Sequence, residues 1–141
     1  MFKFRLKDGL NPEEYPLPKR GSNHSAGYDI YLTDDIELGP NCYINQDSYI
    51  HIDDMPKDTV GLLFPRSSMG IHYQVRLLNS VGVIDADYKG TISIGIHNFG
   101  GKHLKFKKGE RIAQLVFVKY NIIDDDGTDE TRDGGIGSTG R

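Results

Sequence analysis

Short apolar segments recur along this chain, and turn-forming residues separate them at intervals of about ten residues. The apolar segments, which we expect to be strands, cover residues 2–6, 25–32, 35–38, 42–44, 49–52 and 59–64. In the first of them apolar residues alternate with basic ones, which is the period of a half-buried strand. Regular turn signals of this kind are typical of an all-β sandwich or barrel. Because long helical segments do not alternate with the strands, the pattern excludes a doubly wound nucleotide-binding fold.

One short helix and one hairpin are expected in the middle of the chain. Residues 67–74 can open a helix with Ser67 or Ser68 as its N-cap. Residues 79–96 contain two runs of strand-forming residues around a turn rich in Asp and Gly, which predicts a β-hairpin. An acid and an aromatic residue at its tip can face one ligand. The aspartates also have a purely structural explanation, because Asp side chains in turns bond nearby backbone amides.

The last apolar run, residues 112–118, predicts a strand buried on both faces, and the amide of Gln114 within it needs a partner or a ligand. With 141 residues, the chain has the length of one domain. We expect a β domain over residues 1–123. Residues 124–141 combine an acidic linker with a glycine-rich end, a composition that indicates a flexible C-terminal lid.

Composition excludes several kinds of partner and site. The net charge of −3 provides no basic field for nucleic acid. No run of about 18 apolar residues predicts a membrane span, and the amino terminus alternates too soon for a signal peptide. The single cysteine, Cys42, cannot form an internal disulfide, so we expect a reduced, partly buried residue of an intracellular, cytoplasmic protein. The five histidines lack the close spacing of a structural metal site.

Two polar clusters have the groups that bind phosphates. Residues 65–70 offer a guanidinium, two hydroxyls and the amides of a helix start, although a helix cap beside a surface arginine would look the same. The glycine-rich tail can form a nest of backbone amides flanked by Arg132 and Arg141. It lacks the spacing of a P-loop. Together with the acid and the aromatic residue of the hairpin, these clusters indicate a nucleotide site.

Five motifs now stand in an order that resembles the dUTP pyrophosphatase (dUTPase) family of trimeric all-β enzymes. They are Ala-Gly-Tyr-Asp-Ile at 26–30, Pro-Arg-Ser-Ser-Met-Gly at 65–70, the segment 79–90, Gly-Glu-Arg-Ile-Ala-Gln at 109–114 and the tail 132–140. Each motif alone is weak, whereas five in order over nearly the whole length are specific. The resemblance implies a distorted jelly roll or β-barrel of the β-clip type with one short helix, assembled as a homotrimer.

The resemblance also implies an activity. The enzyme would hydrolyse dUTP to dUMP and pyrophosphate, which keeps uracil out of DNA and supplies dUMP for dTMP synthesis. Its sites would lie at subunit interfaces. Mg²⁺ would be held mainly by the triphosphate oxygens and waters, with Asp29 supporting it indirectly, through water.

The third motif would handle the water, the sugar and the base. Asp85 would orient and deprotonate the water that attacks the α-phosphorus. Tyr88 would pack under the deoxyribose, where a 2′-hydroxyl would clash. The uracil edge would be recognised by the Asn79 side chain and by the backbone of the hairpin at Gly82, Val83 and Ile84.

The other motifs would bind the phosphates and close the site. Arg66, Ser67 and Ser68 would hold the phosphates near the bond that is cleaved, and Gln114 would bond the α-phosphate. Four tail residues would close over the γ-phosphate: Arg132, Gly137, Ser138 and Thr139.

The tail departs from the family pattern in two ways. Ile136 stands where the family usually has a phenylalanine on the uracil, so apolar contact replaces a stacking interaction worth about 1–3 kcal/mol per base. The spacing from Arg132 to Ile136 is one residue shorter than usual. Arg141 is therefore an alternative ligand for the γ-phosphate.

Two other functions compete with dUTP hydrolysis. dCTP deaminase shares the fold and similar motifs but needs a glutamate on the strand after the hairpin, where this chain has Gly95. The other alternative is a dUTP-binding regulatory protein with slow turnover, in which ordering of the tail signals to a protein partner.

Overall fold

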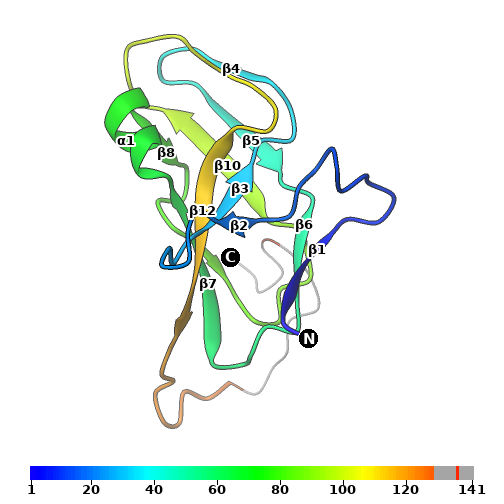
Figure 1. The fold of residues 1–141 in the computed structure, drawn as a ribbon. Helices are drawn as coiled ribbons and strands as arrows, with labels where there is room; N and C mark the ends of the chain where they lie inside the picture. Colours follow the sequence, from blue (N-terminus) through cyan, green and yellow to red (C-terminus); the bar gives the residue numbers. More distant parts are fainter. Residues whose placement is uncertain (129–135, 137–141) are drawn as a thin grey trace.

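The computed structural model describes residues 1–128 and residue 136. The described part contains twelve strands and one short helix (Figure 1). The strands are β1 (Lys3–Leu6), β2 (Lys19–Arg20), β3 (Tyr28–Tyr31), β4 (Ile36–Leu38), β5 (Tyr43–Asp47), β6 (Ile50–Asp53), β7 (Thr59–Pro65), β8 (Val75–Leu77), β9 (Gly82–Ile84), β10 (Ser93–Asn98), β11 (Leu104–Phe106) and β12 (Arg111–Lys119). The helix is α1 (Ser67–Tyr73). The all-β fold predicted from the turn spacing is confirmed.

Every strand pair in the described residues is antiparallel. One sheet has five strands in the order β2-β3-β12-β7-β9, and a second has three in the order β5-β10-β8. Two-stranded ribbons, β1 with β6 and β4 with β11, complete the structure. Alternating residues of β10 are buried, with Ile94 at 1% and Ile96 at 0% exposure, as period-two burial on one face requires. These aliphatic side chains belong to one core that also includes Leu115 of β12.

The hairpin expected over residues 79–96 is wrong in its pairing. Its first arm, β9, pairs with β7 in the five-stranded sheet, whereas its second arm, β10, pairs with β5 and β8. The turn between them does form, because the Tyr88 amide donates to the Asp85 carbonyl oxygen at 3.1 Å. Each arm finds its partner elsewhere in the chain, so the turn directs the chain from one sheet to another. Strand formers beside a turn could not reveal this long-range choice.

Helix α1 has the predicted position but a different N-cap. Arg66 occupies the cap in an extended conformation and makes no side-chain cap bond, so neither Ser67 nor Ser68 is the N-cap. Both serines lie in the first turn, and Met69 anchors the helix in the core. The described residues contain one helix, α1, and its seven residues are too few to cross a membrane.

Two smaller expectations need correction. Strand β12 is fully buried only in its first half, where Ile112, Ala113 and Leu115 are at most 1% exposed, while Val118 near its end is 41% exposed. The strand extends past the core there, so its last side chains reach solvent. Cys42 is a free, exposed cysteine rather than a partly buried one.

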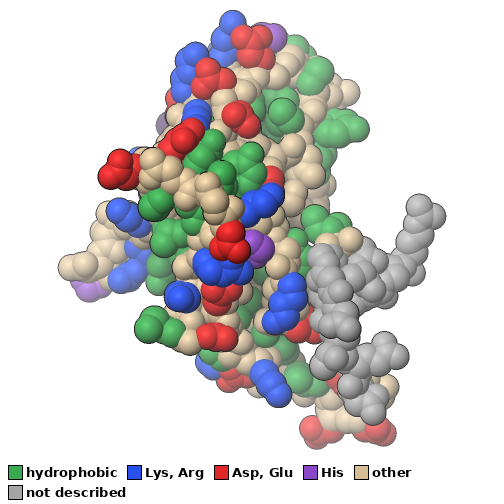
Figure 2. Space-filling view, turned by 90° about the vertical axis from the view of Figure 1, so that its right-hand side faces the viewer, with side chains coloured by type: hydrophobic (Ala, Val, Ile, Leu, Met, Phe, Trp, Pro, Cys, Tyr) green, Lys and Arg blue, Asp and Glu red, His purple; other side chains and the backbone are tan. Residues whose placement is uncertain are grey.

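Figure 2 shows acidic and basic side chains intermixed over one face of the molecule.

Candidate active site

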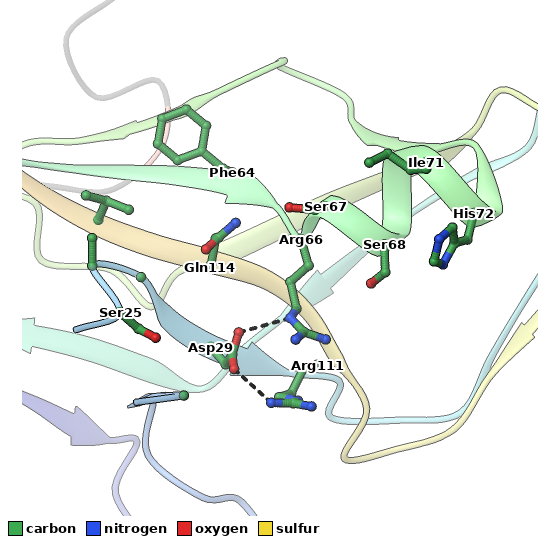
Figure 3. A pocket seen from close by; sticks show the side chains of 14 residues that line it. Ser25, Asp29, Phe64, Arg66, Ser67, Ser68, Ile71, His72, Arg111 and Gln114 are labelled. Carbon is green, nitrogen blue, oxygen red and sulfur yellow. Dashed lines mark hydrogen bonds and ion pairs between the residues drawn. The ribbon is translucent and has the colours of Figure 1, made fainter. Parts of the chain in front are cut away.

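A cleft of about 690 Å³ lies where β3, α1 and β12 come together (Figure 3). It gathers five residues that the sequence assigned to the site: Asp29, Arg66, Ser67, Ser68 and Gln114. These residues come from three of the five motifs, which lie far apart in the sequence. The antiparallel pairing of β12 with both β3 and β7 brings them together, since Gln114 stands opposite Asp29 on one side and Phe64 on the other.

Asp29 holds two guanidinium groups in this cleft. Its Oδ1 lies 3.0 Å from Nε of Arg66, and its Oδ2 lies 3.2 Å from an Nη of Arg111. The Asp29 side chain is 11% exposed, so these charge-assisted contacts are shielded from water. Two cations against one anion leave the trio with a net positive charge. The cleft is therefore suited to a polyanion.

Arg111 was missed as a candidate site residue. Regular alternation would place residues 111 and 114 on opposite faces of β12, because they are an odd number of positions apart. The register shifts between Arg111 and Ala113, and this irregularity lets both Arg111 and Gln114 line the cleft. The arginine was visible within the fourth motif, but the shift in register was not.

Gln114 packs directly on Gly27. A Cβ placed on Gly27 would lie 2.4 Å from Oε1 of Gln114 and 3.2 Å from its Cβ. The Gln114 amide donates to the Pro65 carbonyl oxygen at 3.4 Å, so the expected partner exists. A side-chain amide has a second N–H, which leaves one donor for a ligand. The small residue before β3 thus admits the Gln114 side chain.

The residues assigned to base, sugar and water lie in β9 or close to it in sequence. Val83 is 63% exposed and Ile84 is 8% exposed, so β9 presents alternate side chains to solvent and core. A Cβ on Gly82 would lie 3.0 Å from Cβ of Leu63 and 3.6 Å from Nδ2 of Asn79. Gly82 therefore allows β9 to approach β7 closely, with Asn79 beside it.

Tyr88 is fixed after the turn. Its hydroxyl donates to the Thr91 carbonyl oxygen at 2.9 Å, and a Cβ on Gly90 would lie 2.5 Å from that hydroxyl oxygen. Tyr88 lines a second cleft of about 550 Å³ together with residues of β1 and β6. The described residues that line this second cleft differ from those that line the first.

Asp85 and Ser67 lie at opposite ends of β7. Ile84 stands opposite Gly61, so Asp85 follows near the start of β7, whereas Ser67 follows its end at Pro65. The four steps from Gly61 to Pro65 alone span about 13 Å at roughly 3.3 Å per residue. A reacting phosphate cannot contact Asp85 and Ser67 of the same chain at that separation.

The predicted tail residues Arg132, Gly137, Ser138 and Thr139 lie outside the described residues. Ile136 is described and is 80% exposed in the single chain. No group of three or more His, Cys, Asp or Glu side chains in the described residues could hold a metal ion. Asp29 directs both carboxylate oxygens at guanidinium groups. The described side chains therefore do not form a metal cage of their own.

Fold and cleft together define an all-β protein with a cationic site for phosphate-like anions. A model of the dUTPase family matches residues 13–140, and the chain belongs to this family. The dUTPase (deoxyuridine 5'-triphosphate nucleotidohydrolase) of Photorhabdus laumondii is 38% identical over 146 aligned positions, which cover 97% of this chain and 95% of the relative. That of Tolumonas auensis is 35% identical, with 99% and 97% covered.

Solved structures agree with this assignment. The dUTPase of Streptococcus mutans superposes with a TM-score of 0.76 at 31% identity, covering 86% of this chain and 98% of that one. A dUTPase from phage phi11 of S. aureus superposes with a TM-score of 0.77 at 22% identity, covering 92% and 97%. The jelly-roll type of fold implied by the resemblance is confirmed.

Membership of the family confirms the activity expected from the sequence, the hydrolysis of dUTP. The regulatory alternative is not favoured. Deamination is disfavoured by geometry as well, since a Cβ on Gly95 would lie 2.8 Å from Cδ1 of Leu78 and 3.2 Å from its Cβ. A side chain at this position would require Leu78 to move, and Gly95 itself carries no carboxylate for deamination.

Proposed function

We propose that dUTP is cleaved between two copies of this chain within a homotrimer. One copy supplies the cleft of Arg66, Ser67 and Gln114 for the phosphates. The other supplies Asp85 and Tyr88. The observation that supports this arrangement is the separation of the two groups along β7, which exceeds the reach of a single phosphate.

In the cleft, we assign a role to each side chain. Arg66 is fixed by Asp29 and offers its remaining N–H groups to phosphate oxygens. The hydroxyls of Ser67 and Ser68 donate to the phosphates on either side of the cleaved bond. Gln114 uses its second N–H for an α-phosphate oxygen. These donors stabilise the charge that develops as the bond between the α- and β-phosphates breaks.

On the other copy, Asp85 is the general base. It accepts a proton from the attacking water, whose oxygen bonds to the α-phosphorus while the α–β bridging bond breaks and pyrophosphate leaves. Tyr88 packs against the deoxyribose and excludes a 2′-hydroxyl. Its position is set by the Thr91 carbonyl, which accepts the Tyr88 hydroxyl proton, and by the absence of a side chain at Gly90. The uracil edge is bonded by Asn79 and the β9 backbone at Val83.

Mg²⁺ fits this site as an ion held by triphosphate oxygens and water rather than by a cage of protein side chains. When bound, the ion neutralises phosphate charge and orients the chain of phosphates. The solved structure of the phi11 dUTPase is described with a structural Mg(II) ion in that protein. Asp29 supports the ion here only indirectly, through water, since its oxygens bind Arg66 and Arg111.

The tail completes the site in this proposal. Arg132, Gly137, Ser138 and Thr139 close over the γ-phosphate, and Ile136 covers the uracil by apolar contact. The net charge of −3 and the single cysteine support an enzyme that acts in the cytoplasm without binding nucleic acid.

The role of Asp85 is tested by Asp85→Asn with Asp87→Asn as the matched control. Asp85→Asn should lower kcat for pyrophosphate release by about 10²–10⁴, the usual contribution of general base catalysis, and retain dUTP binding. Asp87→Asn should retain turnover, since we assign Asp87 to the turn. Near-normal turnover of Asp85→Asn would remove this residue from the base role.

The shared site is tested by mixing two variants of low activity. Asp85→Asn and Gln114→Ala each damage a different half of the site. If the halves come from different copies, subunit exchange between the two proteins creates some intact sites, and activity rises above that of either variant alone. Unchanged activity after verified subunit exchange would mean that both halves come from one chain.

A further inference from the structure

The phosphate cleft continues into an adjoining recess that the motifs do not explain. This recess, of about 370 Å³, is bounded by α1, by Tyr31 of β3 and by the segment from Phe106 to Arg111. Arg66, Ser68, His72 and Arg111 line both the cleft and the recess. The two hollows therefore adjoin, and these four side chains lie between them.

His72 contributes to this junction from the last turn of α1. It follows Ser68 by four positions, which places the two side chains on the same face of the helix. Figure 3 shows the Ser68 hydroxyl and the His72 ring on the same side of α1. No hydrogen bond or ion pair within the described part of the chain engages His72. Its ring N–H is thus available to a ligand.

The order of residues along the cleft fixes what His72 can meet. Figure 3 shows Gln114 towards one end, Ser67 and Arg66 in the middle, and Ser68 and His72 at the other end. If Gln114 marks the α-phosphate and Ser67 the bond that is cleaved, the phosphates beyond that bond extend towards Ser68 and His72. An imidazole N–H is a suitable donor to a phosphate oxygen.

We infer that His72, together with Ser68, forms an outer phosphate subsite that binds the part of dUTP released as pyrophosphate. This inference rests on the proposed placement of the α-phosphate at Gln114. Because dUMP has only an α-phosphate, His72 discriminates in favour of the triphosphate and of pyrophosphate and contributes nothing to dUMP binding. His72 therefore makes the enzyme bind the substrate dUTP more tightly than the product dUMP.

The test compares three ligands on three variants of the full chain. KM for dUTP is measured by pyrophosphate release, and Kd for dUMP and for inorganic pyrophosphate by calorimetry. His72→Ala should raise KM for dUTP and Kd for pyrophosphate by about tenfold, the scale of one hydrogen bond to a charged group, and leave Kd for dUMP unchanged. His72→Gln, which keeps an N–H donor, should recover part of the loss. His103→Ala removes a histidine that pairs with Glu37 outside the cleft and should change none of the three values.

Two results would overturn the inference, and a further variant separates its failure from that of the proposed function. An equal loss for dUMP would show a general effect on the cleft. If KM for dUTP and Kd for pyrophosphate do not change in His72→Ala, His72 makes no phosphate contact. If the wild type does not bind pyrophosphate measurably, the proposed pyrophosphate subsite does not exist. Ser67→Ala distinguishes the two levels. If Ser67→Ala weakens dUTP binding and His72→Ala does not, only the outer subsite is wrong, whereas no effect of Ser67→Ala would reject the phosphate cleft itself.

Discussion

Replacing Gly27 by alanine should lower the activity of the enzyme by displacing Gln114. The new Cβ would lie 2.4 Å from Oε1 of Gln114, a distance that real Cβ contacts do not show. The Gln114 backbone cannot retreat, because β12 pairs with β3 on one side and with β7 on the other. The Gln114 side chain must therefore rotate away and lose the contact with the α-phosphate that we propose for it.

The size of the loss follows from the bond removed. A hydrogen bond to a charged group contributes about 1.5–3 kcal/mol, so kcat/KM for dUTP should fall by roughly 10- to 150-fold. The assay is pyrophosphate release by Gly27→Ala, with Gly21→Ala as the matched control. Gly21 lines the same cleft, and its added Cβ would meet only Ser25 Oγ at 3.8 Å, an ordinary contact. The control should therefore keep wild-type activity.

A double-mutant cycle isolates the mechanism. If Gly27→Ala acts by moving Gln114, it should cost little more activity once Gln114→Ala has been made. Thermal unfolding of each variant reports whether the fold itself is weakened. Wild-type activity of Gly27→Ala, or fully additive losses in the double variant, would refute the reasoning.

Three further substitutions test other parts of the structure. Gly90→Ala places a Cβ 2.5 Å from the Tyr88 hydroxyl oxygen and should reduce the ratio of kcat/KM for dUTP over UTP; an unchanged ratio would separate Tyr88 from sugar selection. Ile136→Phe should lower KM for dUTP if the tail covers uracil, and an unchanged KM would place Ile136 elsewhere. The Lys108 amide, which donates to Asp35, lowers the pKa of that carboxyl. The Asp35 carboxylate therefore stabilises the fold at pH values above its unfolded-state pKa, and this stabilisation is lost as the pH falls through its lower folded-state pKa. Asp35→Asn should reduce the difference in Tm between neutral and acid pH.

The sequence predicted the elements better than it predicted their partners. Strand positions follow from local alternation, and all the segments expected to be strands contain strands in the structure. Pairing depends on distant residues, which is why β9 was assigned to the wrong neighbour. Arg111 illustrates the same limit within one strand, because a single irregularity in register decides which face a side chain occupies.

The site shows a related limit, in which motifs identify groups but not their positions relative to one another. The motifs named Ser67 and Asp85 together, yet antiparallel pairing of β9 with β7 sends them to opposite ends of β7. One chain therefore holds two incomplete sites, each with only some of the groups that the reaction needs. In the homotrimer that we propose, the Asp85 end of one copy lies against the Ser67 cleft of the next, which completes one site at every interface. Turnover then depends on assembly, and substitutions that weaken the interface should lower kcat per chain even when both halves of the site are intact.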